Sequence, residues 1–271
     1  MANDIQMTRE LAVRAAKQIV QLAHDNKASH VGGALSVVDI LAVLYGSILQ
    51  YNPLQSGEDS RDRFFYSKGH ACTALYAILH EVGFYDKVML DSFTKDGSYL
   101  TSHVNHRVPG VEWSTGSLGH ALNVACGTAL AAVRKKAAWK VIALLSDGEL
   151  DEGSNWEAIL FAPHHRLSNL TLIVDYNKIQ SFGTVKEVLN LDPLCDKFTA
   201  FGWEVVETDG HDHAALHQIF SQPAHPAKPR AVIANTVKGK GVPFMENELA
   251  WHYKSPDANQ LKEALHALEN K

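Results

Sequence analysis

Residues 146–155 read SDGELDEGSN, and residues 172–183 read LIVDYNKIQSFG. A cluster of acidic side chains is commonly a solvated surface loop, but each of these polar stretches follows a short apolar run, over residues 141–145 and 170–174. Such runs are typical of strands that are buried on both faces of a parallel sheet. The pattern therefore predicts Asp147 and Asn177 at the carboxyl ends of two strands, where open α/β sheets bind their ligands.

Hydrophobic periodicity extends this pattern along the chain. Helical spacing of apolar residues predicts a helix over Thr8–Asp25, and Ser36, with Asp39 three positions later, predicts the capped start of a second helix. Ser255 and Pro256 predict the start of a terminal helix. Further strands are expected at 64–66, 203–207 and 231–235, and further helices at 71–83, 117–138, 153–166, 193–201 and from residue 212.

Strands that alternate with helices predict a doubly wound α/β fold, with a mostly parallel sheet and helices on both faces. The 271 residues are sufficient for a large core, and we expect one domain over residues 1–271. Residues 86–116 are polar and irregular, and they are too long for a plain connection between elements. This stretch is therefore a candidate functional loop.

Composition excludes some classes of function. The net charge of −5 disfavours nucleic acid as a partner. We expect no membrane span, and the amino terminus lacks the pattern of a signal peptide. Three widely separated cysteines predict free thiols in a reducing cytoplasm. No thiolate or carboxylate stands at ligand spacing beside the paired histidines, which disfavours structural zinc; these pairs are His103 with His106, His164 with His165, and His211 with His213.

The two polar stretches together suit a metal-bridged diphosphate. An Asp and an Asn at neighbouring strand ends can share Mg²⁺, which prefers oxygen ligands. Gly148 allows a phosphate to approach the backbone, and the following helix terminus favours negative charge. The chain contains neither GxxxxGK[ST] nor a GxGxxG after a strand, so nucleoside triphosphate and dinucleotide sites are disfavoured.

This arrangement resembles the thiamine diphosphate motif, in which Asp-Gly, an acidic stretch with Glu-Gly and a later Asn follow two strands. Further segments resemble the transketolase family, and because the chain ends at residue 271 it is similar to the amino-terminal subunit of a transketolase made of two polypeptides. The six segments, in the order of the family, are ASHVGGALSVVDILAVLY, RFFYSKGHACTALYAIL, STGSLGHALNVACGTALA, SDGELDEGSNWEA, LIVDYNKIQ and NTVKGKGVPFMEN followed by WH.

The resemblance implies roles for individual residues. It implies that Asp147, Asn177 and the backbone carbonyl of Ile179 bind Mg²⁺, with Ca²⁺ or Mn²⁺ able to substitute. The residues that it assigns to the cofactor are His70, Gly116, Ser117, Leu118, Gly148, Glu149, Asn177 and His252. The residues that it assigns to catalysis are His30, His103 and His252 around the substrate and Glu152 toward an interface between subunits, with Lys254 as a weaker substrate contact.

Two positions depart from the family pattern. Ser146 stands where a glycine usually precedes the metal-binding Asp, a change that removes no ligand. Ser117 stands where many relatives have proline, but it matches the split subunits. The remaining histidines are expected to be structural or on the surface; they include His80, His165, His217, His225 and His266.

The implied activity is transfer of a two-carbon ketol unit from a ketose phosphate to an aldose phosphate in carbohydrate metabolism, for example the pentose phosphate pathway. The resemblance also implies a carboxy-terminal partner subunit that carries the pyrimidine-binding domain, in a symmetric α₂β₂ assembly. One alternative is the α subunit of a 2-oxo acid dehydrogenase, which shares the metal site but lacks the SKGH segment and the KGKG-to-WH tail. A second is a non-catalytic cofactor-binding paralogue, which the four site histidines disfavour.

Overall fold

Five parallel strands form one sheet in a computed structural model that describes residues 2–55 and 57–269. Neighbouring strands follow the order β1-β2-β3-β5-β4, and every pairing is parallel. The doubly wound α/β fold predicted from the sequence is therefore confirmed. The strands span Arg63–Tyr66 (β1), Val141–Ser146 (β2), Leu170–Tyr176 (β3), Glu204–Asp209 (β4) and Arg230–Asn235 (β5).

Burial explains why these segments are strands. Every residue of β2 is buried, and β3 is buried at all positions except Thr171, because both strands lie inside the sheet with helices over both faces. The edge strand β4 has no fully buried residue, and its sequence is correspondingly more polar. Continuous apolar runs thus mark the central strands, as parallel sheets require.

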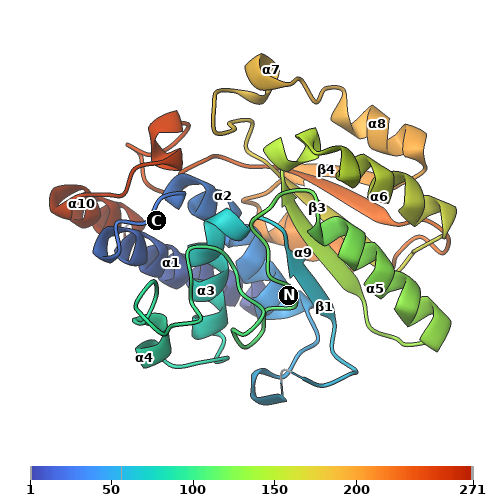
Figure 1. The fold of residues 1–271 in the computed structure, drawn as a ribbon, viewed down its shortest axis with the longest axis horizontal. Helices are drawn as coiled ribbons and strands as arrows, with labels where there is room; N and C mark the ends of the chain where they lie inside the picture. Colours follow the sequence, from blue (N-terminus) through green and yellow to red (C-terminus); the bar gives the residue numbers. More distant parts are fainter. Residues whose placement is uncertain (1, 56, 270–271) are drawn as a thin grey trace.

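Helices cover both faces of the sheet and enclose two apolar cores (Figure 1). One face carries α1 (Ala2–Asp25), α2 (Val31–Val43), α3 (Cys72–Glu81), α9 (His213–Ser221) and α10 (Ala258–Glu269). The other face carries α5 (Ala121–Lys135), α6 (Gly153–His164) and α8 (Leu194–Phe201). The short helices are α4 (Lys87–Leu90) and α7 (Val185–Val188), and single 3₁₀ or π turns lie at Leu44–Ile48, Pro53–Gln55, Gly69–Ala71, Gly148–Asp151 and Leu249–His252.

The start predicted for the second helix was wrong. Helix α2 begins at Val31, so Ser36 lies inside it rather than at its cap. The Ser36 hydroxyl donates to the carboxylate of Asp175 across 2.6 Å, and it is fully buried. Asp39 is also buried, where it contacts two histidines of the α9 region. The polar pattern reflects a network in the core and not a capping box.

The start predicted for the terminal helix was also wrong, by two residues. Helix α10 begins at Ala258, and the carboxylate of Asp257 accepts hydrogen bonds from the amides of Asn259 and Gln260, both across 2.9 Å. Asp257 therefore caps this helix in the place predicted for Ser255. The helix predicted at 117–138 likewise starts later, at Ala121, because residues 116–120 form a turn.

Helix α2 and the turn that follows it correct the expectation about membrane spans. Residues 31–48 are long and apolar enough to cross a membrane by length and composition, with a mean hydropathy of 1.8. However, 83% of this stretch is buried inside the protein, where it packs against α1 and α3. Its apolar character is thus accounted for by the core.

The single domain predicted over residues 1–271 stays a prediction. It includes residues 1, 56, 270 and 271, which lie outside the described residues. Residues 86–116, predicted as an irregular functional loop, contain only the short helix α4, and their last residue reaches the cleft described next.

Candidate active site

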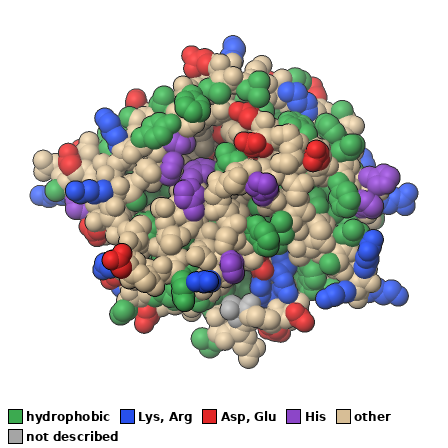
Figure 2. Space-filling model, in the orientation of Figure 1, with side chains coloured by type: hydrophobic (Ala, Val, Ile, Leu, Met, Phe, Trp, Pro, Cys, Tyr) green, Lys and Arg blue, Asp and Glu red, His purple; other side chains and the backbone are tan. Residues whose placement is uncertain are grey.

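A cleft of about 250 Å³ opens at the carboxyl ends of β2 and β3. Figure 2 shows histidine side chains gathered beside a hollow on this face. The structure brings together most of the residues that the sequence predicted, from elements far apart in the chain. The predicted residues that line the cleft are His30, His70, His103, Gly116, Leu118, Asp147, Gly148, Asn177, Ile179 and His252.

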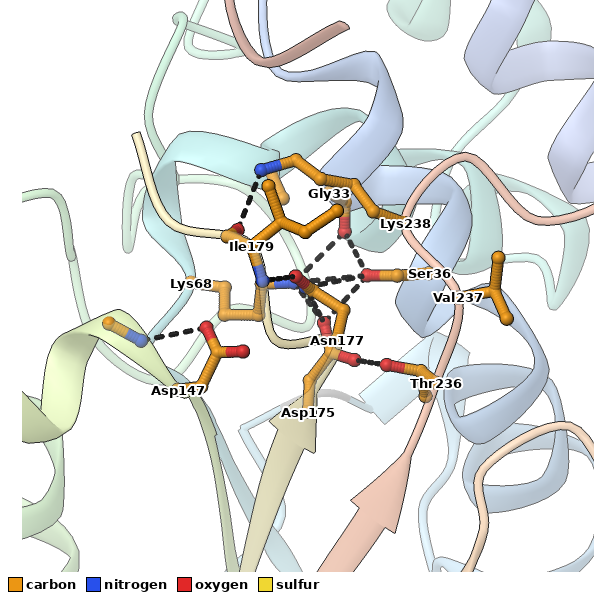
Figure 3. Close-up of polar contacts among 12 residues, drawn as sticks. Gly33, Ser36, Lys68, Asp147, Asp175, Asn177, Ile179, Thr236, Val237 and Lys238 are labelled. Carbon is orange, nitrogen blue, oxygen red and sulfur yellow. Dashed lines mark hydrogen bonds and ion pairs between the residues drawn. The ribbon is translucent and has the colours of Figure 1, made fainter. Parts of the chain in front are cut away.

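Asp147 and Asn177 follow directly after β2 and β3, as predicted. The Asp147 carboxylate accepts hydrogen bonds from the amide of Gly148 across 2.7 Å and from the amide of Lys178 across 2.6 Å. The side-chain oxygen of Asn177 accepts from the amide of Ile179 across 3.1 Å. These bonds fix three side-chain oxygen atoms, two of Asp147 and one of Asn177, at the same edge of the sheet, where they can share a cation (Figure 3).

The site favours a bound cation electrostatically. Burial, together with the nearby Asp175 carboxylate, raises the pKa of Asp147 to about 6. A buried carboxylate beside another carboxylate is destabilised in its charged form, and a divalent cation would reverse that effect. Among the described residues, no three His, Cys, Asp or Glu side chains are grouped to hold a metal. Mg²⁺ usually takes one or two carboxylates from a protein and keeps phosphate and water as its other ligands, so the single carboxylate of Asp147 is compatible with this ion.

A buried polar network supports Asn177 from below (Figure 3). Asp175 is fully buried and forms an ion pair with Lys68, whose ammonium also donates to the carbonyl of Gly33 across 2.9 Å. Burial alone would raise the pKa of Asp175, but the Lys68 charge and the hydrogen bonds outweigh it and lower that pKa. The hydroxyls of Ser36 and Thr236 also donate to this carboxylate. Removing one partner would leave an uncompensated charge in the core.

Lys238 brings a second ammonium to the cleft. It is 2% exposed, donates to the carbonyl of Ile179 across 2.8 Å and contacts Nδ1 of His252 across 3.0 Å. Burial first, and then the charge of Lys68, lowers the pKa of Lys238 to about 8. Because the charge of Lys68 is paired with Asp175, the Lys238 ammonium is the group that gives the cleft a positive charge, which suits a diphosphate.

Neither lysine was among the residues predicted for the site. Both stand inside segments already quoted for the resemblance, Lys68 in SKGH, where His70 was chosen, and Lys238 in VKGKG, where no residue was chosen. The signal that could have found them is a lysine two or three residues after the end of a buried strand, at the ligand-binding edge of the sheet.

Three histidines stand close together in the cleft. The ring centroid of His30 lies 4.8 Å from that of His252 and 5.2 Å from that of His70. Burial, followed by neighbouring positive groups, lowers the pKa of His30 to about 4 and that of His252 to about 3, and it lowers the pKa of His70 well below 6.5. All three rings are therefore neutral near pH 7, so each has one nitrogen without a hydrogen; in His252 this nitrogen is Nδ1, which accepts from the Lys238 ammonium.

His103 completes the group from the loop of residues 86–116. Its ring lies against Gly116, where an added Cβ would stand 3.0 Å from the His103 ring. Its backbone carbonyl accepts from the hydroxyl of Tyr76 across 3.0 Å, which ties the loop to α3. The loop of residues 86–116 thus places His103 in the lining of the cleft, which is consistent with the prediction that this loop is functional.

Glu149 was predicted to border the diphosphate, and its side chain is not part of the lining of the cleft. The carboxyl group is fully buried, and one oxygen accepts from the hydroxyl of Ser67 and from the amide of Gly119, the latter across 2.9 Å. Burial raises its pKa. Glu149 therefore supports the turn before α5 from beneath. The sequence missed this because an acidic residue in a polar stretch gives no sign of the direction in which it points.

Three further predicted residues lie at the edge of the site. Ser117 belongs to the turn before α5, beside the lining residues Gly116 and Leu118. Glu152 is exposed at the amino terminus of α6, and Lys254 is exposed two residues after His252. The structure does not place these side chains inside the cleft.

The cleft fits a diphosphate with a divalent cation. It offers the fixed side-chain oxygen atoms of Asp147 and Asn177 for the cation and the ammonium of Lys238 for the anion. An added Cβ at Gly148 would lie 3.1 Å from the Gln180 side chain, so glycine keeps this wall open. Within the described part of the chain, the buried Nδ1 atom of His30 has no hydrogen-bond partner, which leaves it available to a bound molecule.

The fold and the cleft define an α/β cofactor-binding domain that suits a diphosphate group. Residues 5–269 match the family model of transketolase, thiamine diphosphate binding domain, and the chain belongs to this family. The 2-oxo acid dehydrogenase alternative is accordingly set aside. The roles of individual residues stay predictions that the geometry now makes specific.

Proteins named as transketolase subunits are similar over nearly their whole length. One subunit of apulose-4-phosphate transketolase from Phocaeicola vulgatus is 40% identical over 250 residues, which cover 92% of this chain and 89% of that protein. The 6-deoxy-6-sulfo-D-fructose transketolase subunit SqwG from Clostridium sp. is 39% identical over 242 residues, which cover 89% of this chain and 88% of that protein. This chain is thus similar in extent to such subunits.

Solved transketolases have the same fold. The Campylobacter jejuni enzyme superposes with a TM-score of 0.87 at 30% identity, covering 98% of this chain but 43% of that enzyme. The Pichia stipitis transketolase in complex with sedoheptulose-7-phosphate superposes with a TM-score of 0.88 at 26% identity, covering 99% of this chain and 41% of that enzyme. The chain therefore corresponds to less than half of these longer enzymes.

Proposed function

We propose that this chain is the amino-terminal subunit of a two-polypeptide transketolase, which transfers a two-carbon ketol unit from a ketose phosphate to an aldose phosphate. The observation that carries this proposal is the arrangement of the cleft. The neutral rings of His70 and His252, with centroids 5.2 Å and 4.8 Å from that of His30, lie beside the residues that would bind a diphosphate. A binding site for a diphosphate alone would be compatible with many classes of enzyme. The adjacent histidines add the groups that a sugar substrate needs.

The cofactor would be thiamine diphosphate with Mg²⁺. The Asp147 carboxylate, the Asn177 side-chain oxygen and the Ile179 carbonyl would bind the metal, and Lys238 and His70 would contact the diphosphate. When bound, thiamine diphosphate supplies the carbanion that adds to a carbonyl group. Two family segments, with the metal-binding Asp and Asn at adjacent strand ends, support this assignment.

The histidines of this chain would transfer protons to and from the hydroxyl and carbonyl groups of the sugar. Each neutral ring can accept a proton from a hydroxyl at one nitrogen, or donate one to a carbonyl oxygen, at a pH near neutral. His30 and His252 are adjacent in the cleft, and His103 lines it from the loop of residues 86–116. The low pKa of His30 keeps its ring neutral with a nitrogen that can accept a proton, whereas Nδ1 of His252 already accepts from the Lys238 ammonium, so the Nε2–H of His252 can donate.

A carboxy-terminal partner would complete the active site. The relatives named as transketolase subunits support a partner, and so do apolar side chains that stand exposed beside the cleft and on α6. Phe182, three residues after Ile179, is 83% exposed, and Tyr253, next to His252, is 57% exposed. We propose that this partner carries the pyrimidine-binding domain and the glutamate that activates the cofactor. A symmetric α₂β₂ assembly would bury these side chains, and Glu152 would face the partner.

We also propose a cytoplasmic location. Its support is that Cys72, Cys126 and Cys195 are free thiols, which is the usual state of cysteine in a reducing compartment.

The test is reconstitution. The purified chain, its candidate partner and the mixture are each assayed with Mg²⁺, thiamine diphosphate, an aldose phosphate acceptor and a panel of ketose phosphates. Only the mixture should form a new ketose, and formation should require both the metal and the cofactor. Robust turnover by this chain alone would contradict the two-polypeptide proposal. A mixture that binds the cofactor but transfers no ketol unit would favour the non-catalytic paralogue.

A further inference from the structure

Lys238 reaches the cleft on a short segment that has just left the sheet. Strand β5 ends at Asn235, and the amide of Thr236 makes the last bond to β3, at the carbonyl of Tyr176 across 3.2 Å. The next amide, that of Val237, donates to Nε2 of His211 across 2.9 Å. A side chain from the loop between β4 and α9 thus holds the residue immediately before Lys238.

The hydrogen bonds assign one protonation state to His211. A backbone N–H can only donate, so Nε2 must be the acceptor and the ring hydrogen must be on Nδ1. Nδ1 points at the carboxylate of Asp39 across 2.7 Å. The side chains of His211 and Asp39 are 10% and 5% exposed. His211 is therefore a neutral ring that links a carboxylate on α2 to the amide of Val237.

Further hydrogen bonds hold both Asp39 and the loop that carries His211. The second oxygen of Asp39 lies 3.1 Å from Nε2 of His213, whose Nδ1 lies 2.9 Å from the hydroxyl of Thr8 on α1. The amide of Gly210 donates to the carbonyl of Asn235 across 2.8 Å, and the space beside Gly210 leaves no room for a side chain. The loop that carries His211 is thus held against α1, α2 and β5, so the Nε2 atom has a fixed position.

We infer that His211 is a positioning residue for the diphosphate site: by holding the amide of Val237, it directs the Lys238 ammonium toward the cleft. His211 is not among the residues that line the cleft, so it acts through Lys238 and not by contact with a ligand. The inference rests on the proposed function only in taking thiamine diphosphate as the anion that Lys238 meets.

Two other hydrogen bonds hold the backbone around Lys238. The amide of Gly239 donates to the carbonyl of Gly32 across 2.9 Å, and the amide of Asn247 donates to the carbonyl of Lys238 across 2.8 Å. Loss of the His211 contact should therefore leave the segment folded but less well directed. The expected effect is the size of a single hydrogen bond, about a tenfold change in affinity.

Two substitutions separate the two nitrogens of the ring. Gln in the variant His211→Gln places a carbonyl oxygen near the position of Nε2, so it can still accept from Val237. Asn in the variant His211→Asn places an amide near the position of Nδ1, so it can still meet Asp39 but cannot reach Val237. The matched control is His164→Asn, on the exposed end of α6.

The first measurement is hydrogen exchange of the Val237 amide in the full chain without ligand. Exchange should be faster in His211→Asn and close to wild type in His211→Gln and in the control. The second is the affinity for thiamine diphosphate with MgCl₂, measured by calorimetry on the assembly with the partner. Affinity should fall about tenfold in His211→Asn and stay within about threefold in His211→Gln.

A double-mutant cycle with Lys238→Met tests whether His211 changes the affinity for thiamine diphosphate through Lys238. If His211 acts through Lys238, His211→Asn should cause no further loss of affinity in the Lys238→Met background. Additive losses, or unchanged exchange of the Val237 amide in His211→Asn, would overturn the inference. If the wild-type assembly binds no thiamine diphosphate, the proposed function fails, and the exchange of the Val237 amide alone then decides whether His211 holds this segment.

Discussion

The ammonium of Lys238 donates to the backbone carbonyl of Ile179 across 2.8 Å, and that carbonyl is the third ligand predicted for the metal. A carbonyl oxygen has two lone pairs, so it can accept from Lys238 and still face a cation. A metal cation and an ammonium group that contact the same oxygen atom repel each other, however, and an anion bound to both of them offsets this repulsion. The arrangement is therefore one that a metal-bound diphosphate completes.

Replacing Lys238 should accordingly weaken cofactor binding. Lys238→Met keeps most of the apolar stem but removes the charge, and a lost hydrogen bond to a charged group costs about 1.5–3 kcal/mol, or roughly 10–100-fold in affinity. Calorimetric titration with thiamine diphosphate at fixed Mg²⁺ measures the change. The control is Lys240→Met, at a partly exposed lysine two residues further on. Equal affinities in the two variants would remove Lys238 from the diphosphate site.

Asp147 should be required for both metal and cofactor. Asp147→Ala removes the carboxylate at the end of β2, so activity should be abolished and cofactor affinity should fall by about 2–4 kcal/mol. The affinity that remains should no longer depend on Mg²⁺, which a titration with and without the metal would show. Asp196→Ala, on the exposed surface of α8, is the matched control. A metal-dependent affinity that survives in Asp147→Ala would refute the metal site.

The sequence predicted where the candidate metal ligands lie but not the groups that pack against them, and the reason is physical. Asp147 and Asn177 follow buried strands that pair in the sheet, and a local pattern was enough to locate them. Ser36, Lys68 and Asp175 meet only because α2, β1 and β3 pack together. Asp175 is more than a hundred positions from both Ser36 and Lys68, and local periodicity does not encode contacts over such separations.

His30 should make the chain sensitive to acid. Burial lowers its folded pKa from 6.5 to about 4, so the unfolded chain binds more protons than the folded chain between these values. Stability is then lost as the pH falls below 6.5, and the loss continues until the folded-state pKa is reached. His30→Asn removes this group, and Asn tolerates the left-handed backbone of residue 30, where φ is 67°.

Thermal denaturation at pH 7.5 and pH 5 measures this difference. The melting temperature of wild type should fall more between the two pH values than that of His30→Asn. His164→Asn, on the surface, should behave as wild type. Parallel pH profiles for wild type and His30→Asn would show that the His30 pKa is not depressed in the folded protein.

His103 should serve the sugar more than the cofactor. In the reconstituted enzyme, His103→Ala should lower kcat/KM by roughly 10²–10⁴-fold, the range for loss of a general acid or base, and change cofactor affinity only a few-fold. His106→Ala is the matched control, because His106 is exposed three residues further along the same loop. An unchanged kcat/KM in His103→Ala would make His103 a structural residue of the loop.

Phe182 should contribute to binding of the partner subunit. Its side chain is 83% exposed beside the cleft, and the hydroxyl of Tyr253 donates to the carbonyl of the preceding residue, Ser181, across 3.0 Å, so the loop is held in place before a partner arrives. Burial of an aromatic side chain at an interface stabilises a complex by about 2 kcal/mol or more, so Phe182→Asp should weaken assembly at least about thirtyfold. Sedimentation of the two proteins at micromolar concentration measures assembly.

Leu54→Asp is the control, since Leu54 is 88% exposed on the loop between α2 and β1, away from the cleft. If both variants assemble as wild type does, the partner binds elsewhere; if only Phe182→Asp fails to assemble, the partner covers the rim of the cleft.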